Sequence, residues 1–184
     1  LKADRQLHDA QRIAHIGSWE LSLKTGELVW SDEVYRILGI NRDKHNASYS
    51  ACLDAVHPDD RENLDRAYTE SLKNHKPFEI VYRARLKDGR IKYVHERCEV
   101  DCDSAGIAIR SMGTVQDITE QVVVEQALLE SEEHYRRLIE SSTAIPWEMD
   151  VANMRYLFVG SSVEKLLGIP SEDWCQENFW LSHV

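Results

Sequence analysis

The sequence has few basic residues, and this scarcity excludes two classes of partner. Its 22 Lys and Arg face 32 Asp and Glu, which gives the 184-residue chain a formal net charge of −10. Nucleic-acid backbones and anionic lipid surfaces are both held by clustered Lys and Arg. The chain is therefore expected to bind no nucleic acid and to dock on no anionic membrane.

Cysteines and long apolar runs are also scarce. Cys52, Cys98, Cys102 and Cys175 are too few and too scattered for a disulfide framework, which indicates the reducing conditions of the cytoplasm. They lack the paired spacing of a zinc site, so we expect no metal centre. The longest aliphatic run, at 122–124, cannot cross a bilayer, and the opening residues lack the basic and apolar regions of a signal peptide.

What the sequence does contain is a repeat. The pattern Trp-Glu-apolar-polar-apolar occurs at 19–23 and again at 147–151. The triplet Leu38-Gly39-Ile40 likewise returns as Leu167-Gly168-Ile169. The sequence therefore predicts one complete unit, followed by roughly the first third of a second one at 143–184, in a fragment of a longer protein.

Apolar periodicity and turn residues predict the elements of the complete unit. A helix is expected to start at Asp32 and to stop at Gly39, and a second helix is expected to start at Pro58. The full set is a helix over 1–14, strands at 19–23 and 28–30, helices at 32–38 and 58–72, and strands at 78–86, 91–100 and 107–118. The order β-β-α-α-β-β-β predicts an α+β fold, in which an antiparallel sheet has its helices packed on one face.

From Glu120 to about Ser141 the pattern is helical again. Two apolar seams compete along this helix. One holds Ile118, Val122, Glu125, Leu129, Glu132, Arg136 and Ile139, and the other holds Val124, Leu128, Ser131, Tyr135 and Leu138. Neither seam is purely apolar, so a coiled coil of this helix is expected to be marginal unless folded domains hold its ends.

Five motifs in one order resemble those of the PAS sensory domain family. They are the strand at Trp19-Glu20, the helix ending Leu38-Gly39-Ile40, the box His57-Pro58-Asp59-Asp60, the hairpin Lys87-Asp88-Gly89, and Gly113-Thr114-Val115-Gln116-Asp117-Ile118-Thr119-Glu120, which resembles the family's Asp-Ile-Thr ending. The resemblance covers 15–120. It implies a flanking helix at 1–14, a linker helix at 121–142 and the start of a second PAS domain at 143–184.

The resemblance implies a five-stranded antiparallel sheet that cups a pocket and senses a small ligand, a redox state or light. PAS domains often dimerise through flanking helices and signal along a helix to an output domain of the same chain. In bacteria this output is commonly a histidine kinase, or a diguanylate cyclase or phosphodiesterase, and 144–148 is similar to PAS units of cyclic-dinucleotide proteins. We therefore expect a cytoplasmic, non-catalytic, homodimeric sensor module.

The family's pocket lies between the sheet and the helices, which makes Tyr35, Leu53, Tyr82 and Met112 the candidate lining residues. The ligand stays open. Haem would need an axial histidine on a helix that faces the pocket. The flavin-adduct photosensors of the family carry Cys followed by Arg-Phe-Leu-Gln, whereas Leu53 follows Cys52 here. Two alternatives remain: a ligand-free dimerisation and interaction module, and a redox sensor that holds flavin or haem non-covalently.

The polar clusters of the sequence have structural explanations. His57, Asp59 and Asp60 combine an imidazole with two carboxylates, yet charge in the first turn of a helix accounts for the acidic pair. Cys98 follows His95-Glu96 and is explained by packing of its strand. No catalytic residue is therefore expected.

The last strand passes into the linker helix with no Gly, Pro or Ser between them. A rigid junction transmits a change in the sheet to the helix, whereas a flexible linker would absorb it. Asp117, Ile118 and Thr119 are therefore the candidate signal-relay residues, and the short polar side chains of Asp117 and Thr119 are able to cap the helix. A static spacer is the alternative.

Overall fold

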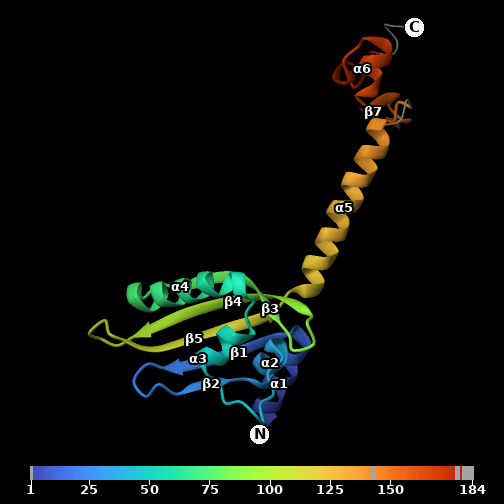
Figure 1. Cartoon of the computed structure of the whole chain (residues 1–184). Helices are drawn as coiled ribbons and strands as arrows, with labels where there is room; N and C mark the ends of the chain where they lie inside the picture. The colour runs from blue at the N-terminus through green and yellow to red at the C-terminus, as the bar shows by residue number, and fades with distance from the viewer. Residues whose placement is uncertain (1, 142–143, 177–178, 180–184) are drawn as a thin grey trace. The chain divides into compact units, whose positions relative to one another are not determined.

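Figure 1 shows the computed structural model, which describes residues 2–141, 144–176 and 179. The chain forms two compact units that divide after Val123. One helix, α5 (Thr119–Ser141), contributes residues to both units. Across the described ranges, no helix is both long enough and apolar enough to span a membrane.

A five-stranded antiparallel sheet forms the centre of the first unit, with the strand order β2-β1-β5-β4-β3. The strands are β1 (Ile16–Ser22), β2 (Leu28–Trp30), β3 (Phe78–Arg85), β4 (Ile91–Cys102) and β5 (Ala108–Asp117). The first and last strands of the unit are neighbours, because Ile16 of β1 pairs with Gln116 of β5. The expected α+β fold with its five-stranded antiparallel sheet is confirmed.

Helices pack against one face of this sheet (Figure 1). They are α2 (Asp32–Leu38), α3 (Tyr49–Ala55) and α4 (Pro58–Asn74), and α1 (Lys2–Ala14) precedes β1. The sequence patterns did not predict α3, which lies between the expected helices at 32–38 and 58–72. A helix of seven residues is too short for a periodic signal. Its first turn is capped by Ser48, whose Oγ accepts a hydrogen bond from the Ala51 N–H.

The two ends of α2 are held in different ways. Gly39 ends the helix in the left-handed conformation, with φ of 67°, as expected for a glycine at this place. Ser31 stands at the N-cap position, but its side chain makes no capping bond to the helix. Its Oγ instead accepts a hydrogen bond of 3.0 Å from the backbone N–H of Ser18, which ties the start of α2 to β1.

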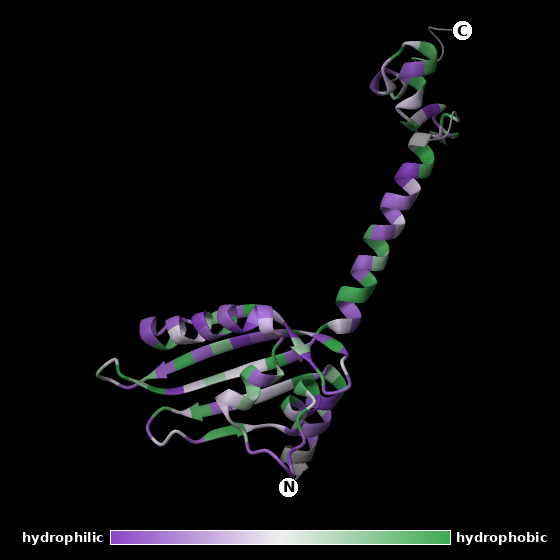
Figure 2. Ribbon diagram, viewed as in Figure 1, coloured by the Kyte–Doolittle hydropathy of each residue, from purple (hydrophilic) through white to green (hydrophobic). Residues whose placement is uncertain are grey.

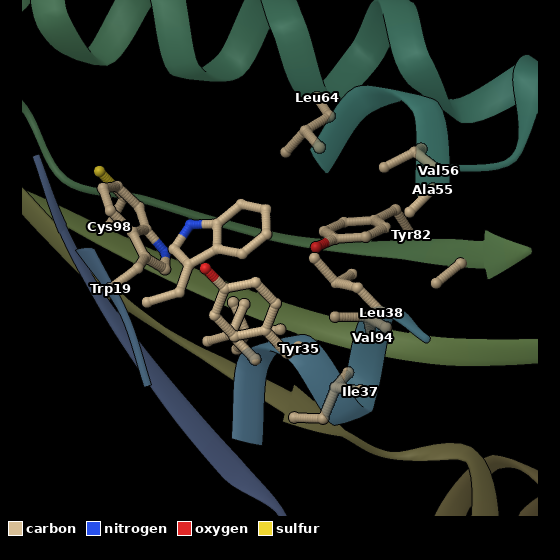
Figure 3. Close-up of a cluster of buried hydrophobic side chains, with 14 residues drawn as sticks. Trp19, Tyr35, Ile37, Leu38, Ala55, Val56, Leu64, Tyr82, Val94 and Cys98 are labelled. Carbon is tan, nitrogen blue, oxygen red and sulfur yellow. The ribbon is translucent and has the colours of Figure 1, made fainter. Parts of the chain in front are cut away.

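The register of the strands places one row of side chains across the inner face, the face covered by helices. Within this row Trp19 stands opposite both Trp30 and Gly113, and Cys98 stands opposite both Gly113 and Phe78. The Trp19 ring fills the space that Gly113 leaves free, since a Cβ at residue 113 would lie 2.8 Å from that ring. Figure 3 shows Trp19, Cys98 and Tyr82 within the core, with Leu64 reaching toward them from α4.

The second unit contains a hairpin followed by short helices. Its elements are β6 (Trp147–Asp150), β7 (Arg155–Val159), α6 (Ser162–Leu167) and α7 (Ser171–Trp174). The sequence of two antiparallel strands and then a helix matches that of β1, β2 and α2. The helix α6 also ends at a left-handed glycine, Gly168 with φ of 72°. The division into a complete PAS unit and the start of a second one stays a prediction.

The second unit is expected to exchange its amide hydrogens quickly unless a neighbouring molecule covers it. Trp147, Phe158 and Leu166 are 63%, 49% and 56% exposed. A two-stranded hairpin is marginally stable in water when no further strands or helices cover it. Hydrogen exchange measured over a dilution series should show weak protection at 144–176, or protection that falls as the protein is diluted. Exchange as slow as in the first unit, in a sample proven monomeric, would contradict the expectation.

The helix α5 carries apolar side chains on its surface. Figure 2 shows hydrophobic and hydrophilic residues alternating along it. The exposed apolar residues come from both predicted seams and include Val124, Leu128 and Tyr135 from one and Leu129 and Ile139 from the other. Both predicted seams therefore expose apolar side chains that are available to pack against another helix.

Candidate functional site

A cavity of about 240 Å³ lies within the first unit, between the inner face of the sheet and the helices. Its walls come from β1, β2, β3, β4 and β5, from α2 and α4, and from the start of α3. The lining residues are Trp19, Leu21, Gly26, Leu28, Trp30, Val34, Leu38, Ala47, Ser48, Tyr49, Cys52, Leu64, Tyr68, Phe78, Glu96 and Val115. The lining is mostly apolar and aromatic, which is the usual character of a small-molecule site.

Aromatic rings form one wall of the cavity. Tyr68 of α4 stands edge-on to Trp19 and to Phe78, with ring centroids 6.1 Å and 6.4 Å away. Tyr49 lies against Tyr68 at 5.0 Å, and its hydroxyl donates a hydrogen bond of 3.0 Å to Asp65 Oδ1. Edge-to-face contacts of this kind stabilise the packing beyond area burial, so the wall is expected to be rigid.

Glu96 is the acidic residue of the cavity. It lies on the inner face of β4, opposite Val115 and Ile80, and is only 6% exposed. Its Oε2 atom is buried and has no hydrogen-bond partner in the part of the chain that the structure describes. Burial raises the pKa of Glu96 from 4.5 to about 7, because a charged carboxylate loses its hydration here. The Tyr82 hydroxyl and the Trp19 indole N–H lie close enough to oppose that rise in pKa.

The polar groups around Glu96 are themselves short of partners. The Tyr82 hydroxyl and Trp19 Nε1 are buried, and neither reaches the geometry of a full hydrogen bond with any group of the described residues. Burial and the nearby Glu96 charge raise the pKa of the Cys52 thiol and of the Tyr82 hydroxyl. Both therefore stay neutral near pH 7, and Glu96 is the group whose charge changes there.

None of the four predicted lining residues is among the residues that line this cavity. Tyr82 is buried behind it with its hydroxyl near Glu96 and Cys52. Tyr35 is buried on α2 and packs edge-on against Trp30, at 5.1 Å between ring centroids. Leu53 is partly buried against the core. Met112 pairs with Glu20 and Glu99 and so lies on the opposite face of the sheet, because alternate residues of a strand face opposite sides.

Glu96 was not among the site residues predicted from the sequence. The signal was present in the strand alternation, since Val94, Glu96 and Cys98 occupy successive positions on one face of β4. A carboxylate between two apolar residues on a core-facing side needs an explanation. In the sequence, His95-Glu96 was considered only as the pair that precedes Cys98. His95 faces the other side of the sheet, where its Nε2 lies 2.6 Å from Glu79 Oε1.

The three predicted relay residues lie together where β5 ends and α5 begins. Asp117 accepts hydrogen bonds from the backbone N–H and the hydroxyl of Thr119, and Lys92 Nζ lies 2.9 Å from its Oδ2. Hydrogen bonds from Thr119 and Lys92 lower the pKa of Asp117 against the effect of burial. The junction is also fastened to β4: the Tyr93 N–H donates to Thr119 Oγ1 at 3.0 Å, and the Ile118 N–H donates to the Tyr93 carbonyl at 2.9 Å.

The His57 box serves the packing of α4 on β3. His57 is the N-cap of α4, and its Nδ1 accepts from the Asp59 N–H. Asp60 accepts from the Arg83 backbone N–H and from two guanidinium nitrogens at 2.7–2.9 Å. These bonds hold the pKa of the Asp60 carboxyl below its usual range. The box is therefore occupied by structural bonds.

The cavity lining can be compared with what the haem and flavin alternatives require. The described lining contains no histidine, so it offers no axial imidazole to haem iron. The volume of about 240 Å³ is also below the roughly 300 Å³ at the lower end of pockets for drug-sized ligands. A flavin or a haem would require the walls to move apart. Among the described residues, no cluster of three or more His, Cys, Asp or Glu could hold a metal ion.

Comparisons with known proteins find relatives among bacterial signalling proteins. Residues 27–115 match the family model described as PAS fold. The chain is 31% identical over 153 residues to sensor protein FixL of Bradyrhizobium diazoefficiens, in a match that covers 83% of this chain and 30% of the relative. It is 25% identical over 169 residues to the probable diguanylate cyclase DgcE of Escherichia coli, which covers 91% of this chain and 14% of the relative. The chain thus spans less than a third of the length of these relatives.

A solved structure is similar to this chain in fold. It is the crystal structure of a sensory box histidine kinase/response regulator from Burkholderia thailandensis, with a TM-score of 0.56 and 27% sequence identity. The match covers 72% of this chain and 98% of the solved chain.

Proposed function

The first unit of this chain belongs to the PAS family, and from this premise we propose that the chain is the sensory module of a bacterial signal-transduction protein. The module senses a small ligand in its cavity and passes the change through Asp117, Ile118 and Thr119 to α5. One observation carries the proposal. The sheet that lines the cavity and holds the buried Glu96 is also bonded, at the end of β5, to the start of α5.

The strand β4 provides the physical connection between the two. Glu96 lines the cavity, while Lys92 and Tyr93, near the start of the same strand, bond to Asp117, Ile118 and Thr119. A small shift of β4 relative to β5 would therefore alter the bonds that hold the first turn of α5. Conformational equilibria of this kind are shifted by a ligand that binds one state more tightly than the other.

The output and the assembly of the full protein are part of the proposal. Relatives named as a sensor protein and a probable diguanylate cyclase support a downstream output domain, either a histidine kinase or a diguanylate cyclase or phosphodiesterase. The exposed apolar residues of α5 support a homodimer through flanking helices. The scarcity of cysteines supports a cytoplasmic location, and catalysis is assigned to the output domain.

Replacing Asp117 by alanine in the full-length protein should change output activity or its response to the signal while the first unit stays folded. The variant loses the bonds to Thr119 and the ion pair to Lys92, and loss of such a cap costs about 1 kcal/mol of stability. This cost is comparable to the few kcal/mol that separate two states of a switch. Circular dichroism checks folding, and an assay of the output reaction measures the effect.

Asp103→Ala is the matched control for this experiment. Asp103 also bonds to local backbone, at the N–H groups of Ala105 and Ile107, but it does so in the turn before β5 and not at the junction. The control should leave output unchanged. If Asp117→Ala is folded and matches the wild type in every output property, the junction is a static spacer and the proposed signal relay is wrong.

A further inference from the structure

We propose that the cavity of the first unit binds a small organic cation, namely a protonated amine with an apolar body, held by the Glu96 carboxylate and the surrounding aromatic rings. This inference rests on the proposed sensory function and deepens it by assigning the chemical class of the ligand.

Glu96 gives the cavity an acidic group that no basic side chain matches. It is 6% exposed, and its Oε2 has no hydrogen-bond partner among the described residues. The Tyr82 hydroxyl and the Trp19 indole N–H lie nearby and lower the Glu96 pKa, but burial outweighs them. The described lining residues include no Lys, Arg or His. A buried carboxylate is costly unless a charge or hydrogen-bond donors compensate it. A ligand that brings an ammonium group supplies both the opposite charge and the N–H donors.

The aromatic wall suits the same ligand. Trp19, Trp30, Tyr49, Tyr68 and Phe78 line the cavity together with Glu96. The faces of aromatic rings carry negative electrostatic potential and attract cations that lie within about 6 Å. The rings also bury the apolar part of a ligand. The volume of about 240 Å³ limits that part to a small group, on the scale of one ring.

Proton binding competes with the cation. Without a ligand the pKa of Glu96 is raised to about 7 by burial. An ammonium group stabilises the ionised carboxylate, so cation binding releases a proton from the protonated form. Tyr82 on β3, Cys52 on α3, Tyr68 on α4 and Cys98 on β4 are the titratable groups near Glu96, and burial raises the pKa of each. All four stay neutral between pH 6 and 8.

The apparent affinity for a cation should therefore rise with pH. A site whose binding-competent form is only partly populated loses apparent affinity by that fraction. With a pKa of about 7, the ionised fraction of Glu96 rises about tenfold from pH 6 to pH 8. The affinity for an amine that stays protonated between pH 6 and 8 should rise by the same factor. The affinity for a neutral ligand should not rise.

Benzylammonium and benzyl alcohol are suitable probes, because they have the same shape and differ in charge. Isothermal titration calorimetry and tryptophan fluorescence should be measured with the full chain at pH 6, 7 and 8. We expect benzylammonium to bind at least about tenfold more tightly than benzyl alcohol at pH 8, and this preference to shrink about tenfold at pH 6. Fluorescence should report on the site because Trp19 and Trp30 line it.

Two matched variants localise the effect. Glu96→Gln keeps the size of the side chain and removes the charge, so the preference for benzylammonium and its pH dependence should disappear. Glu99→Gln makes the same change three residues later on β4, at an exposed position on the outer face, and should keep both. The pH series on the wild type does not depend on the folding of either variant.

The outcomes separate this inference from the proposed function. Equal affinity for the two probes would show a ligand cavity without cation recognition and would overturn the inference. Tighter binding of benzyl alcohol at pH 6 than at pH 8 would show Glu96 acting as a neutral hydrogen-bond donor and would overturn it as well. Binding of neither probe at millimolar concentration also overturns it, while the relay through Asp117 is judged by its own output assay.

Discussion

The unfolding free energy of the protein should fall by about 3 kcal/mol, through Glu96 alone, as the pH rises from about 4.5 to above 7. The pKa of Glu96 is about 7 in the folded chain, against 4.5 for an ordinary glutamate. Between these values the folded state binds more protons than the unfolded state. Stability therefore decreases with rising pH in this window, and each pH unit of it is worth about 1.4 kcal/mol.

Glu96→Gln should remove this dependence. The amide stays neutral throughout, so the variant should match the wild type near pH 4.5 and exceed it by about 3 kcal/mol at pH 8. All other groups contribute to the pH dependence of both proteins, and for this reason the difference between the two proteins is the quantity to measure. Urea denaturation at half-unit pH intervals provides it.

The sign of the effect distinguishes Glu96 from the paired carboxylates. Asp60 and Asp117 have lowered pKa values, so their contributions to stability are present at neutral pH and are lost only as the pH falls through those values. They change stability in the opposite direction and at more acidic pH. A difference between the wild type and Glu96→Gln that stays constant from pH 4.5 to 8 would show that Glu96 does not titrate there.

Gly113→Ala should destabilise the first unit by about 2–3 kcal/mol. A Cβ at this position would lie 2.2 Å from the Arg97 carbonyl oxygen and 2.8 Å from the Trp19 ring. The carbonyl belongs to β4, which pairs with β5 along most of its length, so it cannot move away without disturbing the ladder. The ring can move only by shifting into the cavity that it lines. Urea denaturation with tryptophan fluorescence should detect both the lost stability and the displaced ring.

Thr114→Ala is the matched control for this change. Thr114 is the next residue of β5, faces the other side of the sheet and is exposed. Its replacement should change stability by less than about 0.5 kcal/mol, as is usual for surface positions. If Gly113→Ala is equally mild, the close approach of Trp19 to β5 is not a constraint on the fold.

The local elements of this protein were predictable from its sequence because their signals are local. Alternating apolar residues marked β3 and β4, the turn at Asp88-Gly89 marked the hairpin between them, and Gly39 marked the end of α2. These features need only neighbouring residues to determine backbone conformation. Seven residues of α3 gave no such signal, since a helix of two turns depends on packing and not on periodicity.

The composition of the cavity was not predictable in the same way. Met112 of β5 was a predicted lining residue because the family resemblance places the pocket between the sheet and the helices. The structure turns Met112 to the opposite face, because the inner position is filled by the Trp19 ring from the neighbouring strand and leaves room only for glycine. A side chain supplied by a strand more than ninety residues earlier cannot be inferred from the alternation of β5 alone.

By itself, the sequence determined the α+β class, the order of most elements, the internal repeat and the position of the strand-to-helix junction, because periodicity, turn residues and motif order are properties of short segments. Only the tertiary structure decided that β1 lies next to β5, that Glu96 is enclosed with an unpartnered oxygen, and that Lys92 and Tyr93 bond to the junction. These features arise from pairing between distant segments. The energy of a buried charge or an ion pair depends on which groups that pairing brings within a few ångströms.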